Sequence, residues 1–206
     1  MIRMRTRLLA MGTALVIGGC ASAPLHYYTL MAPAAPQGAA SGAADGAALP
    51  FELLPVSIPA QVDQPQLVVR EGGQGVALLE GERWIAPLGN EVRDALSADL
   101  ARELHSQDAS GLPDNKQPLL RIKLDLRRFD SQPGSNALIA GSWSVHVLHT
   151  PHGGALTCTS SISEPVGPGY DALVQGHQRA IAALAVQIAS VARALGANQT
   201  VGCPAS

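Results

Sequence analysis

Histidines and serines are the first side chains to consider for chemistry in this sequence. His146, His149 and His152 recur at steps of three. On a helix this spacing would place two imidazoles roughly on one side, but these residues lie on a predicted strand that runs into a turn, where steps of three alternate between the two faces. We therefore predict solvated histidines at a strand end and no three-histidine metal site.

A serine nucleophile has equally little support. The segment 141–144 looks most like a nucleophile turn, but it lies within a predicted strand and lacks the second glycine of the Gly-x-Ser-x-Gly pattern. Asp63, Asp125 and Asp130 are as well explained by surface or turn positions as by acid–base roles. The sequence thus predicts no catalytic residue, no metal and no cofactor.

Cys20 has the most specific chemical context of the three cysteines. Residues 1–7 carry three arginines and no acid, and residues 8–19 form an apolar run that is too short for a permanent bilayer span. The run ends in Gly18 and Gly19, immediately before the cysteine. This pattern resembles a bacterial lipobox, in which a peptidase cuts before the cysteine and the sulfur carries a diacylglyceryl group. We predict a signal peptide at 1–19 and lipidation of Cys20.

Two other interpretations of this segment stay open. The first alternative is an ordinary cleaved signal followed by an accidental cysteine. The second is an uncleaved membrane anchor, but the residues after Cys20 supply neither the positive flank nor the additional apolar length that such an anchor would need. Ile17 stands where a lipobox more usually has leucine. Residue 21 is alanine and not aspartate, which in lipoproteins of Gram-negative bacteria implies sorting to the outer membrane.

The remaining cysteines and the charge narrow the protein class. If Cys20 is lipidated, Cys158 and Cys203 form an even pair in an oxidising compartment, so they are either a disulfide or two free thiols. Without the three arginines of the signal, 11 basic residues face 16 acidic ones, a net charge of −5. This balance excludes a strongly basic nucleic-acid surface.

The elements that must position these residues begin after the lipidation site. Residues 27–30 are strong strand formers and predict a short strand. The rest of the N-terminal region, up to residue 48, consists almost entirely of Ala, Gly, Pro and Ser and predicts a flexible segment. A folded domain is expected over 49–196, followed by a C-terminal tail at 197–206.

Within the domain the hydrophobic spacing alternates between strand and helix patterns. Apolar residues recur at steps of four from Leu88 to Leu104 and at helical spacing over 172–195, which predicts two long helices. The other segments have the character of strands, and the last three should form an antiparallel meander. These predicted strands cover residues 51–59, 66–70, 76–80, 119–129, 137–149 and 155–163. The prediction is a single compact α+β domain of order β-β-β-α-β-β-β-α, in which an antiparallel or mixed sheet packs against two helices.

Two surfaces are candidates for contact with a partner. Arg83 and Trp84 could present an aromatic anchor, although a tryptophan directly before a helix more often belongs to the core. The basic face of 121–128 could meet acidic headgroups, although Asp125 interrupts it and a solvated sheet face explains it better.

Taken together, these segments resemble the ABC-type transport auxiliary lipoproteins, the PqiC-like family. The resemblance covers nearly all of the chain after the signal and depends on the order and spacing of its parts. The parts are the lipobox, residues 27–30, 55–59, 83–88 with the helix after them, 141–143 and 169–171.

The resemblance implies a non-enzymatic outer-membrane lipoprotein that faces the periplasm and serves a lipid transport system. Its implied partners are an inner-membrane MCE-domain protein with an associated permease and ATPase, the outer-membrane lipid that holds its acyl anchor, and further copies of itself in a ring. A structural or assembly lipoprotein of the outer membrane is the first alternative, and a periplasmic hydrolase is the second.

Overall fold

The computed structural model describes residues 24–32, 48–151 and 153–205. The predictions for Cys20, for His152 and for most of the flexible segment before residue 48 therefore lie outside the described residues. The described elements follow the order β1 (His26–Tyr28), β2 (Phe51–Leu53), β3 (Gln66–Gly72), β4 (Gly75–Trp84), α1 (Leu88–Leu104), β5 (Leu119–Gln132), β6 (Asn136–Leu148), β7 (Ala155–Pro165) and α2 (Tyr170–Gly196).

The larger sheet has the strand order β2-β5-β6-β7. Strands β5, β6 and β7 form the predicted antiparallel meander, and β2 pairs in parallel with β5. Alternate residues of β5, from Leu120 to Leu126, point into the core because successive side chains of a strand face opposite sides. Gly141 of β6 is needed where β5 has a bulge, since a Cβ there would lie 2.3 Å from the carbonyl oxygen of Asp125.

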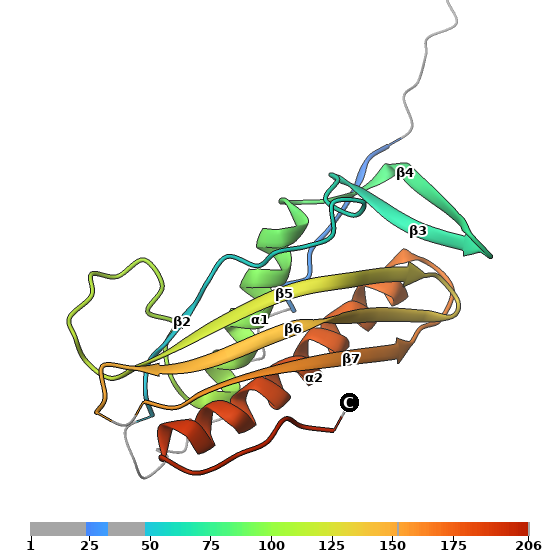
Figure 1. Ribbon diagram of the computed structural model, residues 1–206. Helices are drawn as coiled ribbons and strands as arrows, with labels where there is room; N and C mark the ends of the chain where they lie inside the picture. Colours follow the sequence, from blue (N-terminus) through green and yellow to red (C-terminus); the bar gives the residue numbers. More distant parts are fainter. Residues whose placement is uncertain (1–23, 33–47, 152, 206) are drawn as a thin grey trace, which may run out of the picture.

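Both helices cover one face of this sheet, behind the yellow and orange strands in Figure 1. The stripe of α1 predicted from Leu88 to Leu104 is buried. Helix α2 has the length and composition of a membrane span, yet half of its apolar window is buried in the fold because it packs against α1, β6 and β7. Its apolar character is explained by this packing against the neighbouring helix and the sheet.

A second, smaller sheet has the strand order β1-β4-β3 and lies beside β5 (Figure 1). The hairpin of β3 and β4 is longer than the predicted segments 66–70 and 76–80. The predicted strand at 27–30 is seen as β1, which pairs in parallel with the end of β4. Residues 26–28 therefore belong to the folded structure.

The α+β class and the two helices are as predicted, with the short N-terminal strand preceding the β-β-β-α-β-β-β-α order. The structure differs from the single predicted sheet because the strands separate into two sheets, each with one parallel pair. The predicted strand 51–59 shortens to β2 and a single bridge at Ser57, since Pro55 removes a backbone donor from the ladder.

Candidate functional site

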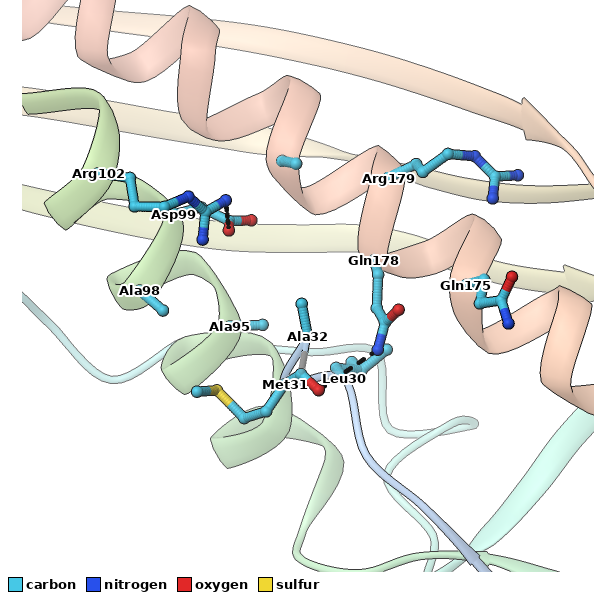
Figure 2. A pocket seen from close by; sticks show the side chains of 11 residues that line it. Leu30, Met31, Ala32, Ala95, Ala98, Asp99, Arg102, Gln175, Gln178 and Arg179 are labelled. Atoms are coloured by element: carbon cyan, nitrogen blue, oxygen red, sulfur yellow. Dashed lines mark hydrogen bonds and ion pairs between the residues drawn. The ribbon is translucent and has the colours of Figure 1, made fainter. Parts of the chain in front are cut away.

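A groove with a volume of about 720 Å³ lies between α1 and α2. Figure 2 shows residues of the segment after β1 lying between the two helices. Small or apolar side chains make up most of the lining, and the polar groups are one carboxylate, two guanidinium groups and two amides. The lining residues are Leu30, Met31, Ala32, Ala95, Ala98, Asp99, Arg102, Gln175, Gln178, Arg179 and Ala182.

The segment after β1 is bonded to both helices. Buried Glu91 of α1 accepts hydrogen bonds from the Thr29 hydroxyl and the Leu30 amide, each at 2.8 Å. From α2, the Gln178 amide donates to the carbonyl oxygens of Thr29 at 3.2 Å and Met31 at 3.5 Å. Figure 2 shows Gln178 reaching toward Met31. These bonds satisfy a buried carboxylate and fix the chain just after β1 against the helices.

Asp99 is the ionisable group of the groove with a displaced pKa. Burial raises the pKa of this carboxyl, while Arg102, which donates a hydrogen bond to it at 2.5 Å, opposes the rise. The lining contains no serine, threonine, cysteine, lysine or histidine. The groove is thus suited to bind an apolar segment edged by a few hydrogen-bonding groups.

Strand β1 is held to β4 by side chains as well as by the backbone. The Tyr28 hydroxyl donates to Glu82 at 2.7 Å, and His26 lies 3.0 Å from the other carboxylate oxygen. The bonds from Tyr28 and His26 lower the pKa of Glu82, and burial together with Glu82 raises the pKa of Tyr28. The start of the folded chain is therefore anchored on the small sheet.

The residues Arg83 and Trp84, predicted as a partner contact, point to opposite sides of the small sheet. Trp84 is 6% exposed and packs edge-on against Phe129, with 6.2 Å between ring centres. The prediction that Trp84 contacts a partner is therefore replaced by a position in the core. Strand β4 extends to this residue and turns its ring inward. Arg83 is partly exposed and forms an ion pair with Glu80 at 3.8 Å.

One polar pair in the core has no counterpart in the predicted sites. Ser131 of β5 and His177 of α2 are both buried, with 2.8 Å between the Ser131 Oγ and the His177 Nε2. The imidazole stacks on Phe129 with 3.9 Å between ring centres. Sequence reasoning missed this pair because the two residues are 46 positions apart and belong to no motif.

The geometry of this pair favours packing over nucleophilic catalysis. Burial lowers the pKa of His177 to about 3, although Asp130 opposes the shift, so the imidazole is a weak base. Its Nδ1 atom is buried and has no hydrogen-bond partner among the described residues, whereas a catalytic histidine is usually oriented by a third group at that atom. The pair links α2 to β5 inside the core.

The structure joins Cys158 of β7 and Cys203 of the tail in a disulfide, with 5.5 Å between their Cα atoms. The bond connects the tail to the edge strand of the large sheet. Among the described residues there is no group of three His, Cys, Asp or Glu side chains placed to hold a metal ion.

Comparison with known families now adds to this geometry. The profile of the ABC-type transport auxiliary lipoprotein component matches residues 28–189, from within β1 into α2. This chain belongs to that family. The assignment agrees with the sequence resemblance described above, and it makes the chain a lipoprotein component of a transport system. No curated protein matches the sequence.

Solved structures support the fold of this transport auxiliary lipoprotein. An uncharacterized protein superposes with a TM-score of 0.63 at 17% identity, over 82% of this chain and 99% of the other. A protein from Xanthomonas campestris superposes with a TM-score of 0.56 at 15% identity, over 85% of this chain and 95% of the other. At these identities the likeness concerns the fold alone.

Proposed function

We propose that this chain is a non-enzymatic outer-membrane lipoprotein that serves an MCE-type lipid transport system. The observation that carries the proposal is the family match over 28–189, which begins only a few residues after the lipobox ending in Cys20. Lipidation would attach the domain to the inner leaflet of the outer membrane, and Ala21 favours sorting to that membrane. The inner-membrane partners would be an MCE-domain protein with its permease and ATPase.

The position of β1 supports a role close to the membrane. Strand β1 begins at His26, six residues after Cys20. Six residues of extended chain span at most about 22 Å. Because β1 is fixed to β4 and the next residues are fixed to both helices, the domain would be held at the membrane surface. A short tether of this kind suits a docking component, including one subunit of a ring.

The groove between α1 and α2 fits this role better than an enzymatic one. Its lining offers apolar surface and hydrogen-bonding groups, which are features of a contact surface. The buried Ser131 and His177 pair lacks the accessible base that a hydrolase would need. The geometry therefore favours binding over catalysis.

Affinity purification tests the proposal directly. The tagged full chain would be cross-linked in cells, extracted in mild detergent and purified alongside a Cys20→Ala variant, which cannot be lipidated. We expect the wild type to recover an MCE-domain protein and the variant to recover much less. Deleting the gene should also sensitise the envelope to detergents. Repeated failure of the lipidated chain to recover an MCE-domain protein would refute the transport role and favour a structural lipoprotein.

A further inference from the structure

The outer face of the small sheet is the main exposed apolar surface in the described part of the chain. Among all described residues, eight large hydrophobic side chains are exposed, and five of these eight lie on the small sheet or directly beside it. These five are between 47% and 61% exposed, and such a concentration of exposed apolar side chains on one sheet marks a candidate contact surface. They are Leu25, Tyr27, Val76, Leu78 and Ile85.

The strand register places these side chains on a common face. Tyr27 pairs with Arg83, and Leu25 and Ile85 lie two positions from these partners, so all four point away from buried Trp84. Further along β4, Val76 and Leu78 alternate with Ala77 and Leu79, which pack on the core. The ladder shifts register between Gln66 and Leu67, and this shift brings both ends of β4 to the same outer face.

The charges around this face do not favour an electrostatic contact. Arg83 forms an ion pair with Glu80 at 3.8 Å, and Arg70 forms one with Asp130 at 3.1 Å. Because each cation has an acidic partner, the face has no surplus of positive charge. Any partner of this surface must therefore be recognised mainly by its apolar character.

The position of the lipidation site identifies the partner. Cys20 precedes the first residue of β1, His26, by six residues, so the Cα atoms of these two residues lie within about 22 Å of each other. We infer that Leu25, Tyr27, Val76, Leu78 and Ile85 form a membrane-contact face that rests on the phospholipid surface holding the anchor. The inference rests on the lipidation proposed for Cys20.

The side-chain chemistry fits this interfacial position. Tyrosine is enriched where headgroups meet acyl chains, because its ring is apolar and its hydroxyl can stay hydrated. The stem of Arg83 can cover apolar surface while its guanidinium remains in water. The three leucine and isoleucine side chains and Val76 would be removed from water by the same contact. The contact would orient the whole domain on the membrane.

Fluorescence quenching tests this inference on the lipidated full chain. Tyr27→Trp would place a fluorophore on the proposed face, and Leu112→Trp would place one in the exposed loop between α1 and β5, at the opposite end of the large sheet in Figure 1. Both proteins would be reconstituted into vesicles of phosphatidylethanolamine and phosphatidylglycerol whose acyl chains are brominated. Emission from buried Trp84 and Trp143 is subtracted using the wild type.

We expect brominated lipid to reduce the added emission of the Tyr27→Trp protein roughly twofold, as for an aromatic ring at the headgroup level, and to leave that of Leu112→Trp unchanged. Quenching should be the same without phosphatidylglycerol, since the face is apolar. Adding Val76→Asp and Leu78→Asp should abolish it, whereas adding Val186→Asp on α2 should not. Equal quenching at positions 27 and 112 would overturn the inference.

Three further outcomes separate this inference from neighbouring ones. If Tyr27→Trp emission is protected from water but insensitive to brominated lipid, a protein surface such as a second copy covers the face, and the inference is wrong. If mass spectrometry shows no acyl chains on the purified chain, the proposed lipidation fails instead. A lipidated chain without quenching at position 27 leaves the transport role intact and refutes the membrane-contact face alone.

Discussion

The outer faces of the two sheets differ in what they expose. The large sheet presents charged and hydroxyl side chains such as Arg121, Lys123 and Thr159, whereas the small sheet presents Tyr27 and Leu78. Both sheets bury their other face against the same core. The difference shows that burying the inner face of a sheet does not require its outer face to be apolar.

The contrast follows the strand that each sheet takes from the start of the described chain. The small sheet contains β1, the first described strand after Cys20, whereas the large sheet contains β2 and the later strands β5, β6 and β7. An apolar outer face is unfavourable in water but favourable against lipid. The comparison therefore separates a sheet that stabilises the domain from one whose exposed face is available for contact.

Truncating the core of the large sheet should have the largest effect on stability. Trp143 is fully buried, and its indole N–H donates to Ser160 at 2.8 Å. We expect Trp143→Ala to lower the free energy of unfolding by about 3–5 kcal/mol, because it leaves a cavity and removes one of the two hydrogen bonds of the Ser160 hydroxyl, which keeps its bond to Gln187. Urea denaturation followed by circular dichroism measures the loss. A loss under 1 kcal/mol would show that the large sheet is not the stabilising layer.

Removing the disulfide should have the next largest effect. Cys158 and Cys203 are separated by 45 positions, so the bond closes a long loop of the unfolded chain. We expect Cys203→Ser to lower the free energy of unfolding by about 2–4 kcal/mol, chiefly by freeing that loop. Reductant should weaken the wild type to the same degree and leave the variant unchanged. Two free thiols in the purified wild type would contradict the bond.

The buried histidine should make stability depend on pH. The pKa of His177 is lowered to about 3 by burial, whereas an unfolded histidine titrates near 6.5. Between these two pH values His177 is protonated in the unfolded chain but neutral in the folded protein, so protonation favours unfolding. The free energy of unfolding is therefore highest above about pH 6.5 and decreases as the pH falls. From about pH 6 to 5, wild type should lose roughly 1 kcal/mol more than His177→Phe. Parallel pH profiles of the two proteins would contradict this.

The smallest effect is expected on the outer face of the small sheet. Leu78 is about half exposed, so Leu78→Asp should change the free energy of unfolding in solution by about 0.5 kcal/mol or less. Thr159→Asp on the outer face of the large sheet serves as the matched control. If Leu78→Asp destabilises the protein by more than 2 kcal/mol in solution, its face is structural, and the contrast between the sheets fails.

The sequence was most informative where a single period dominates. The steps of four in α1 and the alternation in β5 predict their elements well, because each pattern is local. The separation into two sheets was not predictable in this way, since it depends on the parallel pairing of β1 with β4 and on a shift of register within the hairpin. Both are contacts between distant parts of the chain.

The candidate sites show the same division. The lipobox-like pattern before Cys20 is local, so the proposed lipidation can be predicted from neighbouring residues. The groove between α1 and α2 needs the relative position of two helices, and the Ser131 and His177 pair joins residues 46 positions apart. Trp84 was ambiguous because its direction depends on how far β4 extends.

The central claim is that this transport auxiliary lipoprotein works from a lipid anchor at Cys20 in the outer membrane. Mass spectrometry of its N-terminal peptide, taken from inner and outer membranes separated by density, tests this claim most directly. We predict a peptide that begins at Cys20, carries a diacylglyceryl group on the sulfur and is found in the outer-membrane fraction. A peptide that begins elsewhere, lacks acyl chains or remains with the inner membrane would contradict the claim.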